Sequence, residues 1–183
     1  MIRGNYSHHN HGNGLWVDIN NVDTVIENNT VVSNERNGIF LEISCGGTIR
    51  NNYIEDNGTI PKLENWMGGS SGIIVSMTPG VEVYGNTLIN NDKGIGALNW
   101  DHPNVGAVTK CTPELRDLSV HDNTITQSAG AAAGIEAPVQ TENVLSSWGN
   151  QIFSNTYNLS NGAQFRLRGD WTNQPAWTSA GFN

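Results

Sequence analysis

The chain has little charge, and positive charge is the scarcer kind. Charged residues make up 14% of its 183 residues, and 9 Lys and Arg stand against 17 Asp and Glu, for a formal net charge of −8. Nucleic acids are bound through phosphates that need Lys and Arg, so this balance argues against a nucleic-acid partner. An apolar run of about 18 residues, the length that spans a membrane, is also missing, so no membrane partner is expected. The N-terminus has no basic region followed by an apolar stretch, so no signal peptide is visible in this chain.

A short turn phrase recurs along the chain. Each copy is a small or polar residue, then an Asn, then a short stretch that forms a strand. The Asn positions are separated by 24, 23, 34, 37 and 32 residues and are Asn5, Asn29, Asn52, Asn86, Asn123 and Asn155. A second phrase, Gly followed by an apolar strand, keeps step with the first and begins at Gly14, Gly38, Gly72, Gly94 and Gly134. A basic period of 22 to 24 residues, lengthened in places by insertions, indicates a solenoid in which each repeat stacks on the next.

The length of the repeat determines the fold class that we predict. It is too short for a βαβ unit, which needs about 30 residues, and it fits three short strands joined by tight bends. We therefore predict an all-β solenoid, a single domain over residues 1–183 with about six coils. The coils would occupy residues 1–168, and residues 169–183 would form a short C-terminal cap.

The two ends of the solenoid are expected to differ. In the C-terminal cap, Pro175 suits the first turn of a short helix, and Trp171, Trp177 and Phe182 would lie over the last coil. The N-terminal end starts in mid-repeat and would leave an open coil. Because an open coil exposes apolar core and unpaired strand edges, we expect missing coils or a second copy of the chain to cover it.

Two segments, Gly14 to Asn34 and Gly38 to Asn57, resemble the right-handed parallel β-helix proteins, the pectate-lyase-like solenoids. The resemblance implies right-handed, single-stranded coils in which stacked Asn side chains bond the backbone of neighbouring coils. It gives a structural role to an Asn ladder of Asn29, Asn52, Asn86 and Asn123. It also implies a secreted or extracellular protein. Since solenoids of this kind include lyases, hydrolases, epimerases and adhesive spikes, the resemblance does not fix the reaction.

The chain contains two cysteines, Cys45 and Cys111, which allow one disulfide. Cys45 follows an expected strand, and Cys111 lies in the longest insertion, which leaves from the equivalent corner two coils later. Two coils rise by about 9.6 Å, so a direct bridge requires the insertion to fold back. The sequence therefore favours two free thiols and keeps the disulfide as the alternative.

Alternation of side chains along each strand predicts which residues face outward. Leu15, Val17 and Ile19 would face the core in the first coil, as would Ile39, Leu41 and Ile43 in the second. The outward residues would be Trp16, Asp18 and Asn20, then Phe40, Glu42 and Ser44, then Ile74, Ser76 and Thr78. One outer face would thus carry an aromatic column of Trp16 and Phe40 beside a carboxylate pair, Asp18 and Glu42.

Two insertions flank this face. Residues 59–71 add length before the strand that begins at Gly72, and residues 99–117 add length after the strand that begins at Gly94. Long loops on a rigid scaffold are where function usually lies. We therefore predict a groove with aromatic walls, in which the binding residues are Trp16, Phe40, Asn20, Trp66, Trp100, Asp101 and His102, with His11 at the rim.

The residues of the predicted groove suit a polysaccharide or oligosaccharide. Aromatic faces stack on sugar rings, and two carboxylates on adjacent coils have Cα atoms about 4.8 Å apart, near the spacing of a retaining glycosidase. Two like charges this close raise the pKa of one of the two carboxyl groups. A general acid needs such a raised pKa to hold its proton near neutral pH. We predict a glycoside hydrolase with Glu42 as acid/base and Asp18 as nucleophile or base.

Other interpretations remain open. Asp18 and Glu42 can be ordinary solvated residues or a calcium pair in a noncatalytic glycan-binding or structural solenoid. A calcium-assisted lyase or epimerase would need a base, for which Lys62 and Lys110 lie in the insertions. The histidines His8, His9 and His11 cannot all reach one metal ion without a bend, so no metal site is predicted there. No cofactor is expected, apart from calcium in these alternatives.

Overall fold

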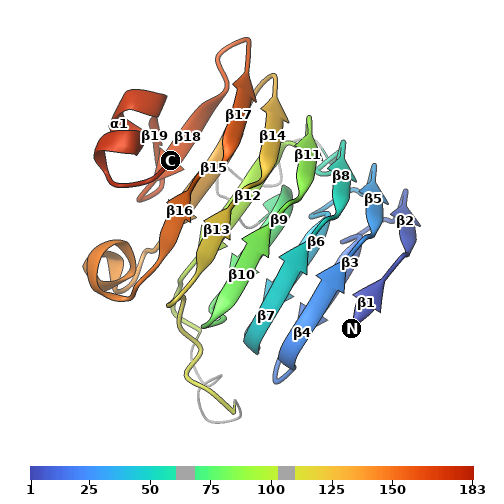
Figure 1. The fold of residues 1–183 in the computed structure, drawn as a ribbon, viewed down its shortest axis with the longest axis horizontal. Coiled ribbons are helices and arrows are strands. Elements are labelled where there is room, and N and C mark those ends of the chain that lie inside the picture. Colours follow the sequence, from blue (N-terminus) through green and yellow to red (C-terminus); the bar gives the residue numbers. More distant parts are fainter. Residues whose placement is uncertain (61–68, 103–109) are drawn as a thin grey trace.

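The computed structural model describes residues 1–60, 69–102 and 110–183. These residues form three sheets, and each coil contributes one strand to each sheet in turn (Figure 1). Sheet A contains β1 (Ile2–Arg3), β4 (Val22–Glu27), β7 (Cys45–Arg50), β10 (Val81–Tyr84), β13 (Ser119–His121) and β16 (Gln151–Phe153). Sheet B contains β2 (Tyr6–His8), β5 (Thr30–Val32), β8 (Tyr53–Glu55), β11 (Thr87–Ile89), β14 (Thr124–Gln127) and β17 (Thr156–Leu159).

Sheet C carries the predicted functional face. It contains β3 (Leu15–Asp18), β6 (Ile39–Glu42), β9 (Ser71–Ser76), β12 (Lys93–Leu98), β15 (Ala131–Glu136), β18 (Gln164–Leu167) and β19 (Asp170–Thr172). Neighbouring strands are parallel, except that β19 turns back antiparallel on β18. The predicted all-β, six-coil parallel β-helix is confirmed. No helix in the described ranges is long and apolar enough to cross a membrane.

The core is a column of inward side chains that repeats from coil to coil. Sheet A supplies Ile26, Ile49, Val83 and Val120, sheet B supplies Val31, Ile54, Leu88 and Ile125, and sheet C supplies Leu41, Val75, Ala97 and Ile135; all are at most 1% exposed. Each large aliphatic side chain buried in this way contributes about 1.5–3 kcal/mol. The alternation that buries these residues also directs their neighbours outward, and it therefore sets the outer faces.

The recurrent turn phrase occupies the bend between sheets A and B. The residue before each Asn has a positive φ: 66° at Gly4, 54° at Asn28, 55° at Asn51, 63° at Gly85, 52° at Asp122 and 54° at Ser154. Gly, Asn and Asp tolerate this left-handed conformation better than most residues, which explains why they recur there.

The Asn that follows each left-handed residue points inward and joins adjacent coils. Asn52 is typical, because its backbone N–H and its Nδ2 both donate to Asn86 Oδ1, at 3.0 and 2.9 Å. Nδ2 also donates to the Ile26 carbonyl at 3.0 Å, and Asn52 Oδ1 accepts the same pair of bonds from Asn29. The chain of bonds runs through Asn5, Asn29, Asn52, Asn86, Asn123 and Asn155.

A second Asn ladder, which the sequence analysis did not identify, lies at the bend after sheet B. Asn10, Asn34, Asn57 and Asn91 repeat the same bonds, for example Asn57 Nδ2 to Asn91 Oδ1 at 2.9 Å. Each lies five positions after a residue of the first ladder, as Asn57 does after Asn52. That constant offset is visible in the sequence and could have revealed the second ladder.

The Gly positions at the start of sheet C have a steric cause. A Cβ at Gly38 would lie 2.6 Å from the Gly72 carbonyl oxygen, and one at Gly94 would lie 2.1 Å from that of Ala132. Successive coils approach too closely there for any larger side chain. The Gly phrase at Gly14, Gly38, Gly72 and Gly94 therefore marks close contact between coils. Gly134 lies within β15 opposite Gly96, so its predicted place at a strand start is wrong.

The alternation of inward and outward side chains in the first coil ends one residue earlier than expected. Ile19 has a φ of 46° and Asn20 a φ of 65°, so the chain leaves the strand after Asp18. Ile19 is consequently 42% exposed, and the prediction that it faces the core is wrong. Ile43 is buried, but it packs against Met77 in a small cluster outside the main core.

The C-terminal segment covers the last coil with two of the three expected aromatic residues. The helix α1 (Gln174–Ser179) has Asn173 as its N-cap and Pro175 in its first turn. Trp177 is 0% and Phe182 3% exposed, and the Trp177 ring stacks on Phe165 with centroids 5.1 Å apart. Trp171 is 50% exposed, so its predicted place over the coil is wrong. It pairs with Arg166 across β18 and β19, on the outer side of sheet C.

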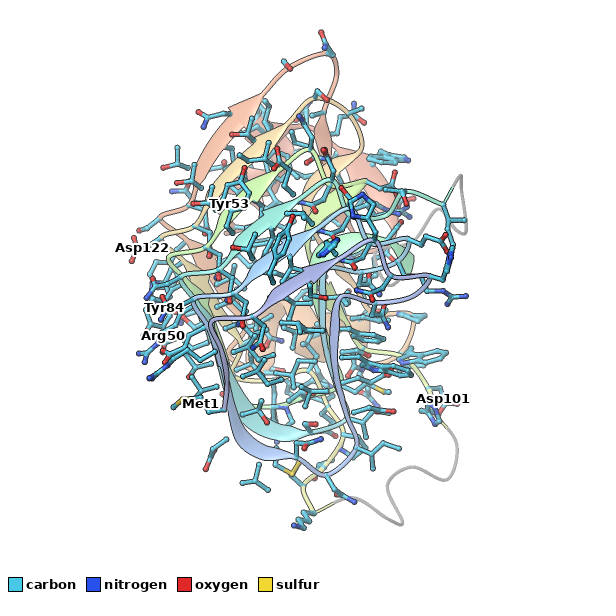
Figure 2. The ribbon with its side chains drawn as sticks, turned by 90° about the vertical axis from the view of Figure 1, so that its right-hand side faces the viewer. Met1, Arg50, Tyr53, Tyr84, Asp101 and Asp122 are labelled. Carbon is cyan, nitrogen blue, oxygen red and sulfur yellow. A yellow bond between two sulfur atoms is a disulfide. The ribbon has the colours of Figure 1, made fainter. Side chains whose placement is uncertain are left out.

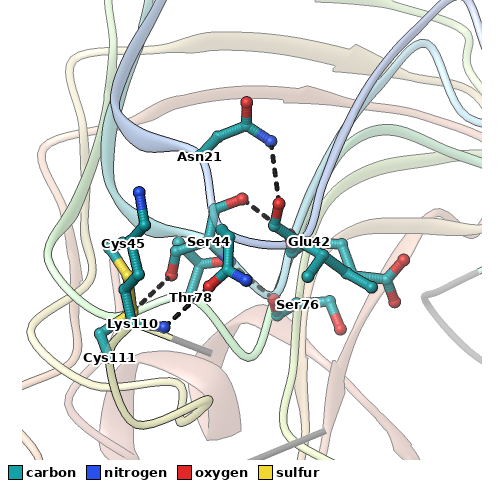
Figure 3. Close-up of a disulfide and its surroundings, with 10 residues drawn as sticks. Asn21, Glu42, Ser44, Cys45, Ser76, Thr78, Lys110 and Cys111 are labelled. Atoms are coloured by element: carbon teal, nitrogen blue, oxygen red, sulfur yellow. Dashed lines mark hydrogen bonds between the residues drawn. A yellow bond between two sulfur atoms is a disulfide. The ribbon is translucent and has the colours of Figure 1, made fainter. Parts of the chain in front are cut away.

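Cys45 and Cys111 form a disulfide with Cα atoms 5.8 Å apart, so the preference for free thiols is wrong. Lys110, directly before Cys111, lies at the first coil, where its backbone N–H donates to Asn20 Oδ1 at 2.7 Å. Cys111 also contacts the Ser44 carbonyl (Figure 3). The disulfide therefore attaches Cys111 of the second insertion to the corner that follows Asp18 and Glu42.

Removing this disulfide is expected to destabilise the protein. The variant Cys45→Ala/Cys111→Ala should lose about 2–4 kcal/mol of unfolding free energy, because the bridge restricts a loop in the unfolded chain. Urea unfolding should give the same unfolding free energy for the variant and for the reduced wild type. A variant as stable as the oxidised wild type would contradict a stabilising role of the disulfide.

Candidate functional site

Asp18 and Glu42 lie side by side on sheet C. The strands β3 and β6 pair in register with Asp18 opposite Glu42, and each residue is the last of its strand. The turns that follow are fixed by side chains: Asn21 Nδ2 donates to the Asp18 carbonyl at 2.8 Å, and Ser44 Oγ donates to the Glu42 carbonyl at 2.9 Å. In the next coil Thr78 Oγ1 donates to the Ser76 carbonyl at 2.9 Å (Figure 3). The strands β3, β6 and β9 thus each end in a turn that a side-chain hydrogen bond closes.

The two predicted aromatic residues stack beside the carboxylates. Trp16 lies opposite Phe40, with ring centroids 5.9 Å apart and planes 5° apart. Trp16 is 57% exposed, whereas Phe40 is half-buried. The Trp16 indole N–H also donates to the Glu42 carboxyl group. Trp16 therefore links the aromatic pair to the carboxylate pair.

Burial changes the ionisation of both carboxyl groups. It raises the pKa of Asp18, while the Ile19 backbone N–H and the charge of His102 act to lower it. One Asp18 oxygen, Oδ1, is buried with no hydrogen-bond partner in the described part of the chain. Burial, and then the charge of Asp18, raise the pKa of Glu42 to about 7, against the lowering effect of the Trp16 indole. Because the charge of Asp18 contributes to the raised pKa of Glu42, Glu42 is the member of the pair that can carry a proton near neutral pH.

The raised pKa of Glu42 predicts a stability change with pH. A carboxyl group whose pKa is higher in the folded state costs stability as pH rises from 4.5, its ordinary value, through about 7. The variant Glu42→Gln should therefore be more stable than the wild type above pH 7, by about 1–2 kcal/mol after allowance for partial exposure. Below pH 4 the two should converge. Thermal melts across this range, with exposed Asp170→Asn as control, test it; a constant difference at all pH values would contradict it.

The segment after β12 brings His102 to the carboxylate pair. His102 is close enough for its charge to act on Asp18. Its ring lies edge-on to Trp100, with centroids 5.4 Å apart and planes 88° apart. Asp101 lies at the outer edge of this side of the molecule, away from Arg50, Tyr84 and Asp122 on the opposite side (Figure 2). Asn20 contributes by holding Lys110, as described above.

Two predicted binding residues are not part of this arrangement. His11 precedes β3, whereas Asp18 ends that strand, and the His11 ring contacts Glu35 at 2.5 Å with 93% of its side chain exposed. The prediction that it assists at the rim is therefore wrong. Trp66 lies outside the described residues. Among those that are described, no group of three His, Cys, Asp or Glu side chains could hold a metal ion.

Two outward residues of β9 on the outer face of sheet C are buried. Ile74 and Ser76 point outward from the strand, yet both are 0% exposed. Ile74 forms an outer apolar cluster with Leu98 and Ala131, and Phe40 packs against it. An apolar strip therefore follows the carboxylate pair along the stack.

An ion pair, which the sequence analysis did not identify, lies further along the same face. Glu136 continues the column of Asp18 and Glu42 in strand register. It pairs with Arg166 at 2.7 Å, and both side chains are 7% exposed. Arg166 alternates with inward Phe165, and this pattern could have identified it as an outward cation.

Two cavities open beside Trp100, at the ends of the middle strands of sheet C. One, of about 380 Å³, is lined by Met77, Asn99, Trp100, Asp101, His102, Pro113, Glu114, Val139, Gln140 and Trp148. The other, of about 520 Å³, is lined by Leu98, Trp100, Glu136, Ala137, Pro138, Arg168 and Gly169. Asp18 and Glu42 line neither cavity. His102 connects the first cavity to the carboxylate pair.

Residues 1–172 match the model of a protein family described as a right-handed beta helix region. The chain belongs to this family. A search of curated proteins found no match for this β-helix protein. Among solved structures it is similar to an alginate lyase from Paenibacillus sp. str. FPU-7, with 14% identity over 89% of this chain and 74% of the other. The TM-score is 0.29, so neither activity nor substrate is inferred from that likeness.

Proposed function

We propose that this β-helix protein is a glycoside hydrolase that cleaves a polysaccharide at Asp18 and Glu42. The observation that carries the proposal is the pairing in register of two carboxyl groups that act on each other. Burial and the charge of Asp18 raise the pKa of Glu42 to about 7, and burial also raises the pKa of Asp18. Two carboxyl groups whose acidities are separated by their surroundings can act as general acid and as nucleophile.

The chemistry would proceed in two steps. Protonated Glu42 donates its proton to the glycosidic oxygen as the bond to the leaving sugar breaks, and the Asp18 carboxylate attacks the anomeric carbon. Glu42, now ionised, removes a proton from water, and the resulting oxygen nucleophile displaces Asp18 from the sugar. Adjacent parallel strands place the Cα atoms about 4.8 Å apart, which favours the closer carboxyl spacing of retaining enzymes.

The aromatic pair supports a sugar as the ligand. Because Phe40 stacks on one side of Trp16, the exposed surface of Trp16 remains to contact the C–H surface of a sugar ring. The same indole donates its N–H to Glu42, so the ring would position both the sugar and the acid.

Activity on a panel of neutral and acidic polysaccharides tests the proposal. We expect new reducing ends without an unsaturated product, in the presence of EDTA as well as in its absence. An unsaturated product that requires calcium would identify the alternative lyase. Binding without any cleavage would instead support a noncatalytic glycan-binding solenoid.

A further inference from the structure

We propose that the cavity of about 380 Å³ beside Trp100 binds a protonated amine carried by a saccharide. The proposal rests on the carbohydrate function above and specifies one chemical feature of the ligand, an unsubstituted amino group on the sugar. We call this cavity the Trp100 cavity.

Three successive coils build the Trp100 cavity at the ends of sheet C strands. Met77 follows β9, Trp100 follows β12 and Val139 follows β15. Trp148, which precedes β16, supplies a second indole ring. Aromatic rings with nearby acidic groups form sites for ammonium groups, because the negative ring face attracts a cation.

The charged groups that line the cavity are predominantly acidic. Asp101 and Glu114 both line it. Within the described ranges Asp101 forms no ion pair, while Glu114 lies 3.6 Å from Arg116. The neighbouring cations Arg166 and Arg168 are paired with Glu136 and Glu142. The lining thus offers Asp101 as a counter-ion for an added cation.

The same corner already contains one cation over an indole ring. Arg116 lies 5.4 Å from the centroid of the Trp148 ring. Arg116 is not among the residues that line the cavity. The pair shows that this corner accommodates a cation against an indole beside a carboxylate. Trp100 and Asp101 supply a further indole and a further carboxylate to the cavity lining.

The position of the cavity favours a saccharide over other amines. It lies along the same edge of sheet C as Asp18 and Glu42. His102 lines the cavity, and its charge acts to lower the pKa of Asp18. From β3 to β12 is three strand spacings, or about 14 Å along the stack. An oligosaccharide of several units can therefore occupy both places at once. The net charge of −8 further favours a cationic chain over a polyanionic one.

Binding of glucosamine oligomers tests this inference. Calorimetry on the full chain would compare oligomers with free amino groups and N-acetylated oligomers of equal length. We expect the free-amine form to bind about 10-fold more tightly, an advantage that shrinks at high salt. Asp101→Asn should reduce the preference about 5-fold or more, while Asp170→Asn, an exposed change elsewhere, should leave it intact.

Several results would overturn the inference. Equal affinity for both oligomers would do so, as would an unchanged preference in Asp101→Asn and Trp100→Ala variants whose melting temperatures show that they are folded. A lysine tetrapeptide that binds as tightly as the glucosamine oligomer would show that the saccharide is not recognised. Asp18→Asn/Glu42→Gln should keep the amine preference, so that failure of the cavity and failure of the hydrolase proposal are separate outcomes.

Discussion

The Glu42→Gln variant is expected to lose about 10²–10⁴-fold in kcat on any polysaccharide that the wild type cleaves. Glutamine keeps the shape of the side chain but cannot donate the proton that the leaving sugar needs. Asp18→Asn should lose a comparable factor, because the amide is no longer a nucleophile. Initial rates of reducing-end release measure both effects. Cleavage retained by both variants would exclude Asp18 and Glu42 as the catalytic pair.

The pH dependence of cleavage provides a control for this assignment. Activity requires a protonated Glu42, so the rate should fall as pH rises through about 7. The Trp16 indole lowers the pKa of Glu42, and Trp16→Phe should therefore move this alkaline limit to higher pH. A purely structural role for Trp16 would reduce the rate without shifting the limit.

Asn52→Ala is expected to cost about 3–5 kcal/mol of unfolding free energy. The side chain is 2% exposed, and its loss removes the acceptor of the Asn29 backbone N–H and the side-chain donor to the Ile26 carbonyl. Asn29 Nδ2 also loses one bond but keeps its bond to the Ile2 carbonyl. Buried polar groups left unpaired are more costly than the bonds that they lose. Urea unfolding followed by circular dichroism measures the effect.

The matched control is Asn158→Ala on the exposed side of sheet B. Asn158 makes one long bond, to Thr126 Oγ1 at 3.4 Å, so its replacement should change stability by less than about 0.5 kcal/mol. A similar small effect at Asn52 would show that the ladder contributes little to the fold.

The sequence alone predicted the coils because each coil is built by local rules. A left-handed residue before Asn52 or Asn86, an inward Asn and an alternating strand recur in every repeat, so a period of 22 to 24 residues is visible without coordinates. The same alternation placed Asp18 opposite Glu42 and Trp16 opposite Phe40.

The predictions that were wrong concern residues outside the regular repeat. Ile19 leaves the core because a left-handed turn interrupts the alternation. The disulfide joins Cys45 and Cys111, which are 66 residues apart in the sequence and come together only in the folded chain.

By itself, then, the sequence determined the solenoid, its register and the pairing of Asp18 with Glu42, because these depend on contacts between equivalent positions of successive repeats. Only the tertiary structure decided the surroundings of that pair: the buried outer strip, the position of His102 and the cavities beside Trp100. These features depend on insertions of unequal length that obey no period. The path of such a segment is set by packing and cross-linking in three dimensions.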